Sequence, residues 1–231
     1  MSHNGDRATC GNVTTVKRSG SRSEATATAL VEAALEIVQE SGVKSVTHRK
    51  VCSRAGVALG SSTYHYENLD ALILDAFAHY VETVSVKYED YFSRVTCDEE
   101  LIDAMLRVTT ILTTDVGNAI LDWELLAEAG REPAYRELAQ RWSHRARSAI
   151  EAYVSKRTAF MLETIWDGTT IQRVLNGTQL SDADLRDLIG AALALDTERK
   201  YPESNGRPQK PSRKPPASAS RSRSTRQSWK V

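Results

Sequence analysis

The stretch from Val46 to Leu72 reads VTHRKVCSRAGVALGSSTYHYENLDAL, and it decides the fold. Thr47 is a favourable helix N-cap, so a helix is predicted to start there and to stop before Gly56. A second short helix is expected at about residues 59–66, with Val57 packed beneath the turn between the two. Two helices joined by a tight, glycine-containing turn over an apolar residue are typical of a helix-turn-helix motif.

The segment before this motif is predicted to form one amphipathic helix, at about residues 24–41. Its apolar residues recur at intervals of three and four, as on one face of a helix. Gly42 follows directly and is a natural C-cap, because glycine readily adopts the left-handed backbone that ends many helices. The stripe expected in the core comprises Ala27, Leu30, Val31, Ala34, Leu35 and Val38.

The remainder of the chain also predicts helices. Only one of the six prolines, Pro133, lies in the body of the chain, and no segment alternates as a strand would. Helices are expected at about residues 69–95, 98–113, 117–130, 133–155, 157–176 and 182–195. We therefore predict an all-α protein, in which an N-terminal three-helix helix-turn-helix domain precedes a larger helical domain.

Composition indicates the boundaries of these domains. Residues 1–22 and 196–231 lack an apolar period and cannot bury enough apolar surface to offset the entropy of ordering. We expect a disordered arm at 1–22, the helix-turn-helix domain at 23–68, the second domain at 69–195 and a disordered basic tail at 196–231. The sequence contains neither a membrane-spanning apolar run nor a secretory signal, so we expect a cytoplasmic protein with no membrane partner.

Catalytic and metal-binding patterns are missing from the sequence. The three cysteines lie far apart, the five histidines are scattered, and there is no glycine-rich phosphate loop or nucleophile motif. We therefore expect no catalytic site, no metal and no cofactor, and an enzyme is the least favoured class. Cys52 is expected to be a small buried residue, with redox sensing as the alternative.

The helix-turn-helix region resembles the DNA-binding domain of the TetR family of transcriptional regulators. The resemblance covers about residues 24–75 and includes the Ala33–Ile37 run before Gly42, the Ala55-Gly56-Val57 turn, and Gly60 at the start of the third helix. The chain departs from the family at several positions, and two of them lie in the third helix and at the start of the fourth. A tyrosine is usual at the position of Thr63, whereas here Tyr64 follows one place later, and Leu69 stands where a phosphate-binding lysine is usual.

This resemblance implies a repressor that binds double-stranded operator DNA as a homodimer and releases it when a small-molecule inducer enters the second domain. By position, Thr47, Tyr64 and His65 would contact phosphates, with Arg49 near the backbone or the groove. Thr47 has the alternative of acting only as a helix cap. Base edges would be approached by the start of the third helix, where Leu59 offers only an apolar contact. The implied DNA-binding residues are Thr47, Arg49, Leu59, Gly60, Ser61, Thr63, Tyr64 and His65.

In this family the last two helices form a four-helix dimer interface. Here the apolar residues expected to serve that role are Ala159, Leu162, Ile165, Trp166 and Thr169 on one helix and Leu185, Leu188, Ile189, Ala192 and Leu193 on the other. The alternative is that both helices pack only inside the monomer.

The middle helices supply the expected ligand pocket, with Trp123, Tyr91 and Met105 as the ligand-binding residues. Asp122 and Glu124 flank Trp123. A carboxylate that faces inward would favour a cationic or hydroxylated ligand, whereas a solvated helix face is the plainer interpretation. The long helix at 69–95 links both domains and is the natural lever between them.

Charge is unevenly distributed, although the net charge is zero. Residues 71–195 carry 12 basic and 20 acidic residues, whereas residues 196–231 carry 10 basic and 3 acidic ones. The basic tail either adds nonspecific affinity for DNA or only increases solubility. A further alternative for the whole chain is a helix-turn-helix regulator or architectural protein without a ligand, which would have a filled core between the middle helices.

Overall fold

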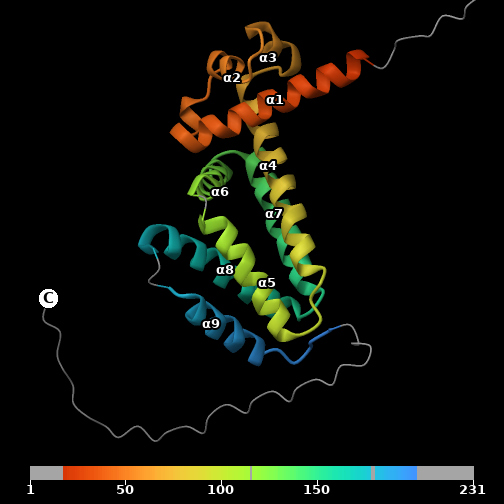
Figure 1. Cartoon of the computed structure of the whole chain (residues 1–231), viewed down its shortest axis with the longest axis vertical. Helices are drawn as coiled ribbons and strands as arrows, with labels where there is room; N and C mark the ends of the chain where they lie inside the picture. Colours follow the sequence, from red (N-terminus) through yellow and green to blue (C-terminus); the bar gives the residue numbers. More distant parts are fainter. Residues whose placement is uncertain (1–17, 115, 178–179, 202–231) are drawn as a thin grey trace, which may run out of the picture.

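The computed structural model describes residues 18–114, 116–177 and 180–201 of the chain. These residues form α-helices and one short 3-10 helix, without a strand, so the predicted all-α class is confirmed. Figure 1 shows α1 to α3 as a head at one end, and α5, α8 and α9 at the other, with the long helices α4 and α7 running between. The head is the helix-turn-helix region, and we call the rest the body.

Every predicted helix is present, and most boundaries lie within a few residues of those expected. The elements are α1 Arg18–Ser41, η1 Val43–Ser45, α2 His48–Arg54, α3 Leu59–His65, α4 Leu69–Phe92, α5 Asp98–Thr114, α6 Val116–Ala129, α7 Pro133–Glu151, α8 Lys156–Asn176 and α9 Asp182–Ala194. No helix in these described segments is long and apolar enough to cross a membrane.

Helix α1 begins earlier than predicted, at Arg18, within the stretch expected to be a disordered arm. The expected start near Glu24 was wrong. Once a buried stripe has anchored a helix, extending it by one residue adds one backbone hydrogen bond and needs no new nucleation. The stripe itself lies in the core, where Leu30, Ala34 and Val38 are buried. Gly42 ends the helix with a φ of 78°, and its N–H donates to the Val38 carbonyl, as its expected role as a cap requires.

The helix-turn-helix is built as expected. The Thr47 hydroxyl accepts a 3.2 Å hydrogen bond from the Lys50 N–H and so caps α2. Gly56 adopts a φ of 67° in the turn, and the partly buried Val57 packs against the core. Cys52 is buried, in agreement with the structural interpretation of this cysteine.

Helix α4 carries the head into the body. Its first turn is capped by the Asn68 side chain, which accepts a 2.8 Å hydrogen bond from the Ala71 N–H. The Tyr66 hydroxyl donates to the Asp75 carboxylate across 2.7 Å and holds the corner between α3 and α4. In addition, α1 packs against both α4 and α6, so the head rests on two helices of the body.

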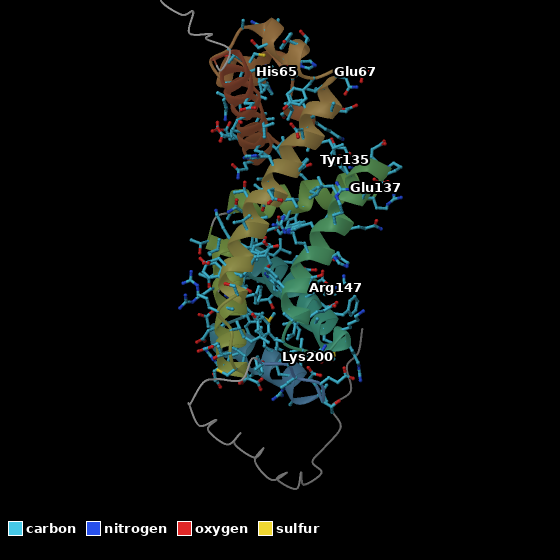
Figure 2. The ribbon with its side chains drawn as sticks, turned by 90° about the vertical axis from the view of Figure 1, so that its right-hand side faces the viewer. His65, Glu67, Tyr135, Glu137, Arg147 and Lys200 are labelled. Atoms are coloured by element: carbon cyan, nitrogen blue, oxygen red, sulfur yellow. The ribbon has the colours of Figure 1, made fainter. Side chains whose placement is uncertain are left out.

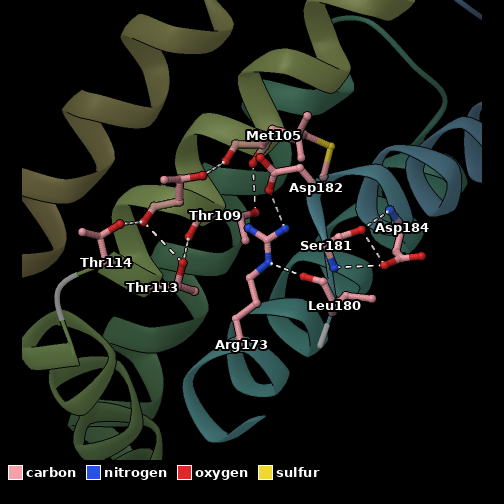
Figure 3. Close-up of polar contacts among 11 residues, drawn as sticks. Met105, Thr109, Thr113, Thr114, Arg173, Leu180, Ser181, Asp182 and Asp184 are labelled. Atoms are coloured by element: carbon pink, nitrogen blue, oxygen red, sulfur yellow. Dashed lines mark hydrogen bonds and ion pairs between the residues drawn. The ribbon is translucent and has the colours of Figure 1, made fainter. Parts of the chain in front are cut away.

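The corner between α8 and α9 is held by polar contacts (Figure 3). The Arg173 guanidinium donates to the Leu180 carbonyl and to the Asp182 carboxylate. Ser181 and Asp184 form a capping box at the start of α9. These contacts fix the direction of α9 relative to α8.

The chain does not leave the body at Asp196 as predicted. The Lys200 N–H donates to the Tyr153 carbonyl across 2.8 Å, and the Tyr201 ring stacks on that of Tyr153. Arg199 also forms an ion pair with Asp98. The predicted boundary of the tail was wrong, because the Tyr201 ring packs on the Tyr153 ring beyond it. The rest of the predicted arm and tail, residues 1–17 and 202–231, lies outside the described residues.

Candidate DNA-binding surface and ligand cavity

Helix α3 presents its first turn and its outer face to solvent. The Leu59 side chain is 57% exposed and that of Tyr64 is 81% exposed, which is unusual for large apolar and aromatic residues. Gly60 and Thr63 are also exposed, whereas Ser61 and His65 are half-buried. A helix that exposes such residues on its outer face is suited to entering a groove of DNA.

Helix α2 contributes the other predicted DNA-binding residues. Thr47 and Arg49 lie at its start and line a shallow groove beside the end of α1. A hydrogen bond between His48 Nδ1 and the buried Ser62 hydroxyl ties the first turn of α2 to α3. Ser62 is therefore a structural residue that orients α3. Its role was not visible in the sequence, because the two residues are 14 positions apart.

The body contains a cavity of about 390 Å³. Helices α4, α5, α6, α7 and α8 all contribute to its wall. The lining residues are Tyr88, Leu112, Asp122, Trp123, Leu126, Ala139, Trp142, Ser143, Ala146, Glu163, Trp166, Asp167, Thr170 and Ile171. The volume lies in the range of about 300–1,000 Å³ that is usual for small-molecule sites.

The three residues predicted to bind a ligand are placed differently. Trp123 lines the large cavity. Tyr91 lines a separate cavity of about 90 Å³, which borders the large one at Tyr88 and Leu112. Met105 lines neither of these two cavities and is buried in the core. Its size and apolar character are equally suited to packing, and its position on α5 turns it toward neighbouring helices.

Asp122 is the acidic side chain of α6 that faces the cavity. It is only 8% exposed, lines the cavity, and accepts a 2.7 Å hydrogen bond from the Tyr80 hydroxyl of α4. Burial raises the pKa of Asp122 to about 7, and the charge of Asp167 raises it further. Glu124 lies on another face of α6, beside Gly42 at the end of α1.

Helix α8 supplies two more carboxylates to the wall, at Glu163 and Asp167. The Arg147 guanidinium of α7 donates to Glu163 across 2.6 Å, and the Ser143 hydroxyl donates to the same carboxylate. Figure 2 shows Arg147 in the lower half of the molecule, far from the head. Asp167 is exposed as a residue, but the groups packed around its carboxyl desolvate it and raise its pKa to about 6, and the neighbouring Glu163 adds to the shift.

The sequence analysis missed Glu163 and Asp167 as site residues. Together with Trp166 and Thr170 they lie at positions 163, 166, 167 and 170, which is the spacing of one helix face. That spacing was a usable signal, but α8 was interpreted as a dimerisation helix. The residues expected in the dimer interface, Ala159, Leu162, Trp166 and Thr169, are instead buried within the monomer.

A different set of apolar residues is exposed on α8, on α9 and at the residue that follows α9. The Leu175 side chain is 67% exposed, and Leu188 is the one exposed member of the set predicted on α9. Leu185, Ile189, Ala192 and Leu193 are buried inside the monomer. We call the exposed set, defined by Phe160, Ile171, Leu175, Leu188 and Leu195, the apolar face.

An exposed helix of a helix-turn-helix, joined by one long helix to a hollow helical body, defines the class of helix-turn-helix regulators with an internal ligand cavity. Comparison with known proteins agrees. No family model matches the chain. The HTH-type transcriptional regulator CymR of Pseudomonas putida is 25% identical over 153 residues, which cover 66% of this chain and 69% of that protein.

Solved structures give the same result. SCO7518, a transcriptional regulator of Streptomyces coelicolor A3(2), matches with 28% identity, a TM-score of 0.68, and coverage of 72% of this chain and 97% of that chain. SCO1917, a TetR family member of the same species, matches with 27% identity, a TM-score of 0.63 and the same coverage. The multidrug binding protein EbrR in complex with ethidium matches with 26% identity and a TM-score of 0.61, over 72% of this chain and 98% of that chain. The resemblance is confirmed: the chain is a transcriptional regulator of the TetR type.

Proposed function

We propose that the protein is a repressor that binds a pseudo-palindromic operator as a homodimer and leaves it when a small-molecule inducer enters the cavity. One observation supports this proposal most directly. Tyr80 lies on α4, the helix that carries the head, and its hydroxyl donates to Asp122 in the cavity wall. A ligand that contacts Asp122 is therefore one hydrogen bond away from the helix that positions α3.

Binding to DNA is assigned to the helix-turn-helix. We propose that Tyr64, His65 and Thr47 contact phosphates, while the start of α3, from Leu59 to Ser61, lies in the major groove. The exposure of Leu59 and Tyr64 supports this assignment. Phosphate contacts set the position of the helix, and base contacts and DNA shape select the sequence.

A small-molecule ligand is proposed on the strength of the cavity and of the relatives. EbrR is a multidrug binding protein whose complexes include proflavin, ethidium and malachite green. The cavity of about 390 Å³ is open in this chain, which favours a ligand-responsive regulator over an architectural protein with a filled core.

The homodimer is assigned to the apolar face of α8 and α9. Five large apolar side chains exposed on two neighbouring helices favour burial against a second copy of the chain. Such a dimer would present two α3 helices about 34–36 Å apart, which is one turn of DNA. Because its target is DNA, we place its action in the cytoplasm.

Release is proposed to follow from a population shift. A ligand that binds better to a conformation with misplaced α3 helices would draw the dimer away from the operator. Two routes lead from the cavity to the head: α4 through Tyr80, and α6, whose Glu124 abuts Gly42 at the end of α1.

The test begins with selection of fragments of the source genome that the full-length protein retains. An operator found in this way is then used in mobility-shift titrations with a panel of small organic molecules. The proposal expects one palindromic site for each dimer and its loss with at least one ligand. Failure to retain any duplex, at low salt and with a folded dimer, would refute it. Specific retention that no ligand reverses would instead support an architectural role.

A further inference from the structure

The cavity wall carries more negative charge than the described residues neutralise. Asp122 and Glu163 are buried, whereas Asp167 lines the wall from an exposed position. Asp122, Glu163 and Asp167 all line it, and Arg147 is the cation beside them. Arg147 is paired with Glu163, so Asp122 and Asp167 have no ion pair among the described side chains. Burying an unpaired carboxylate such as Asp122 is unfavourable, and a carboxylate with a perturbed pKa in a cavity wall is a candidate for contact with a ligand.

Several polar groups in the same wall lack a hydrogen-bond partner among the described residues. They include the Trp166 indole N–H and the Thr170 hydroxyl. The Trp142 N–H and the Tyr88 hydroxyl lie near one another but outside hydrogen-bond geometry. An indole N–H can only donate, so its missing partner must be an acceptor. Buried donors of this kind are rare in folded proteins. These atoms have almost no accessible surface, so a ligand in the cavity reaches them only if a wall side chain moves.

The rest of the wall is aromatic. The indoles of Trp123, Trp142 and Trp166 line the cavity, and the Tyr88 ring contacts that of Trp166 edge to face at 5.1 Å between centroids. Aromatic faces attract cations through their negative quadrupole and stack on flat rings. The carboxylates and the aromatic rings of this wall therefore both favour a cation with a flat ring system.

We propose that this cavity binds an organic cation with a flat aromatic body, held by Asp122 and Asp167 and enclosed by Trp142 and Trp166. The inference rests on the proposed function, because it identifies this cavity as the inducer site. The cationic group is assigned to the two unpaired carboxylates.

Other ligand classes fit the wall less well. A neutral apolar ligand would leave both carboxylates without a counter-charge, and an anion would be repelled by them. A metal ion is also disfavoured, because no three acidic, histidine or cysteine side chains within the described ranges converge on a point that could hold one.

The test compares the permanent cation berberine with its neutral planar lactam, 8-oxoberberine. Both are titrated against the full-length protein at pH 8 without DNA, and quenching of tryptophan fluorescence reports binding. Berberine is expected to bind at least about tenfold more tightly. Asp122→Asn and Asp167→Asn should each weaken berberine binding by about tenfold or more and leave that of the lactam unchanged. Glu137→Gln, an exposed charge change on α7, should have no effect.

Equal affinity for the two probes, or full berberine affinity in both aspartate variants, would overturn the inference. Thermal melts of the same variants at pH 8 exclude unfolding as the cause of a loss. The proposed function is tested separately with operator DNA. Operator binding without any preference for the cation refutes the ligand class alone. Aspartate-dependent cation binding by a protein that retains no duplex refutes the repressor and leaves the ligand class standing.

Discussion

The Tyr80 hydroxyl of α4 donates a 2.7 Å hydrogen bond to the Asp122 carboxylate of α6, and the same hydroxyl lies 3.2 Å from the Asn118 carbonyl. Tyr80 thereby joins the helix that carries the head to the wall of the ligand cavity. Its ring also contacts that of Trp142, another wall residue, edge to face. Ligand occupancy and the position of the head can be coupled at this one side chain.

Tyr80→Phe is expected to separate ligand binding from release of DNA. The ring and its packing remain, but the hydrogen bond to Asp122 is lost, so a ligand that displaces Asp122 no longer pulls on α4. The ligand concentration needed for half-release of the operator should rise by about fivefold or more relative to the directly measured Kd. Parallel fluorescence and mobility-shift titrations measure both quantities. A ratio equal to that of the wild type would remove Tyr80 from the coupling route.

Asp122→Asn is expected to stabilise the protein without ligand. The folded-state pKa of about 7 lies above the ordinary value of 3.8, so the stabilising effect of the protonated form is complete below pH 4 and is lost as the pH rises through 7. Asparagine imitates the protonated form at every pH. The free energy of unfolding of the variant should therefore increase relative to that of the wild type between pH 4 and pH 8, by on the order of 3 kcal/mol.

Urea unfolding at a series of pH values and one protein concentration measures this difference. Glu137→Gln, an exposed change on α7, serves as the control and should track the wild type. A stability difference for Asp122→Asn that does not vary with pH would contradict the assignment of a raised pKa.

Cation binding is expected to strengthen as the pH rises. Asp122 and Asp167, with pKa values raised by burial to about 7 and about 6, must be ionised to pair with a cation. Of the groups that face them, Tyr80 donates to Asp122, and Arg147 and Glu163 lie beside Asp167. Berberine affinity should increase by about tenfold or more between pH 5.5 and pH 8.

The same titration in Asp122→Asn provides the internal comparison. Without Asp122, which titrates near pH 7, the affinity for berberine should depend on pH more weakly, and the remaining change should be centred near pH 6 because of Asp167. Affinity that is flat with pH in the wild type would show that neither carboxylate pairs with the ligand.

Tyr64→Ala is expected to lower affinity for the operator by roughly 10- to 100-fold, the effect of losing a hydrogen bond to a charged phosphate. Since phosphate contacts carry no sequence information, the loss should be similar on operator and on random duplex. Leu59→Ala should instead act on the operator alone. Fluorescence anisotropy measures both, and Val86→Ala, an exposed apolar change on α4, is the control. Full affinity in Tyr64→Ala would place the phosphate contact elsewhere.

Leu175→Glu and Leu188→Glu are each expected to shift the protein from dimer to monomer, because a charge placed in an apolar interface must be desolvated. Sedimentation velocity at micromolar concentration measures the change, and operator affinity should fall with it. Val86→Glu tests the same chemistry on an exposed residue of α4 and should leave the dimer intact. Dimers that persist in both leucine variants would locate the interface on another surface.

Local patterns in the sequence were sufficient to predict the helices and the helix-turn-helix. A stripe such as that of α1, the Thr47 cap and the positive φ of Gly42 and Gly56 all depend on neighbours within a few positions. The corner at Ser181 depends on equally local contacts, because the cap and Asp184 are three residues apart. The departures lie at the ends, where Arg18 extends α1 and Tyr201 packs on Tyr153.

Only the tertiary structure decided which faces of the body helices line the cavity. Helix α8 is apolar around much of its circumference, so its sequence alone did not distinguish the face toward the monomer core from the face toward solvent. Trp166 was expected in the dimer interface, but packing buries it inside the monomer and exposes Leu175 further along the same helix. Likewise, Asp122 and Asp167 meet in one wall because α6 and α8, 45 residues apart along the chain at these positions, pack side by side. The spacing of apolar residues shows which residues share one face of a single helix, whereas a cavity depends on how several helices are arranged in space.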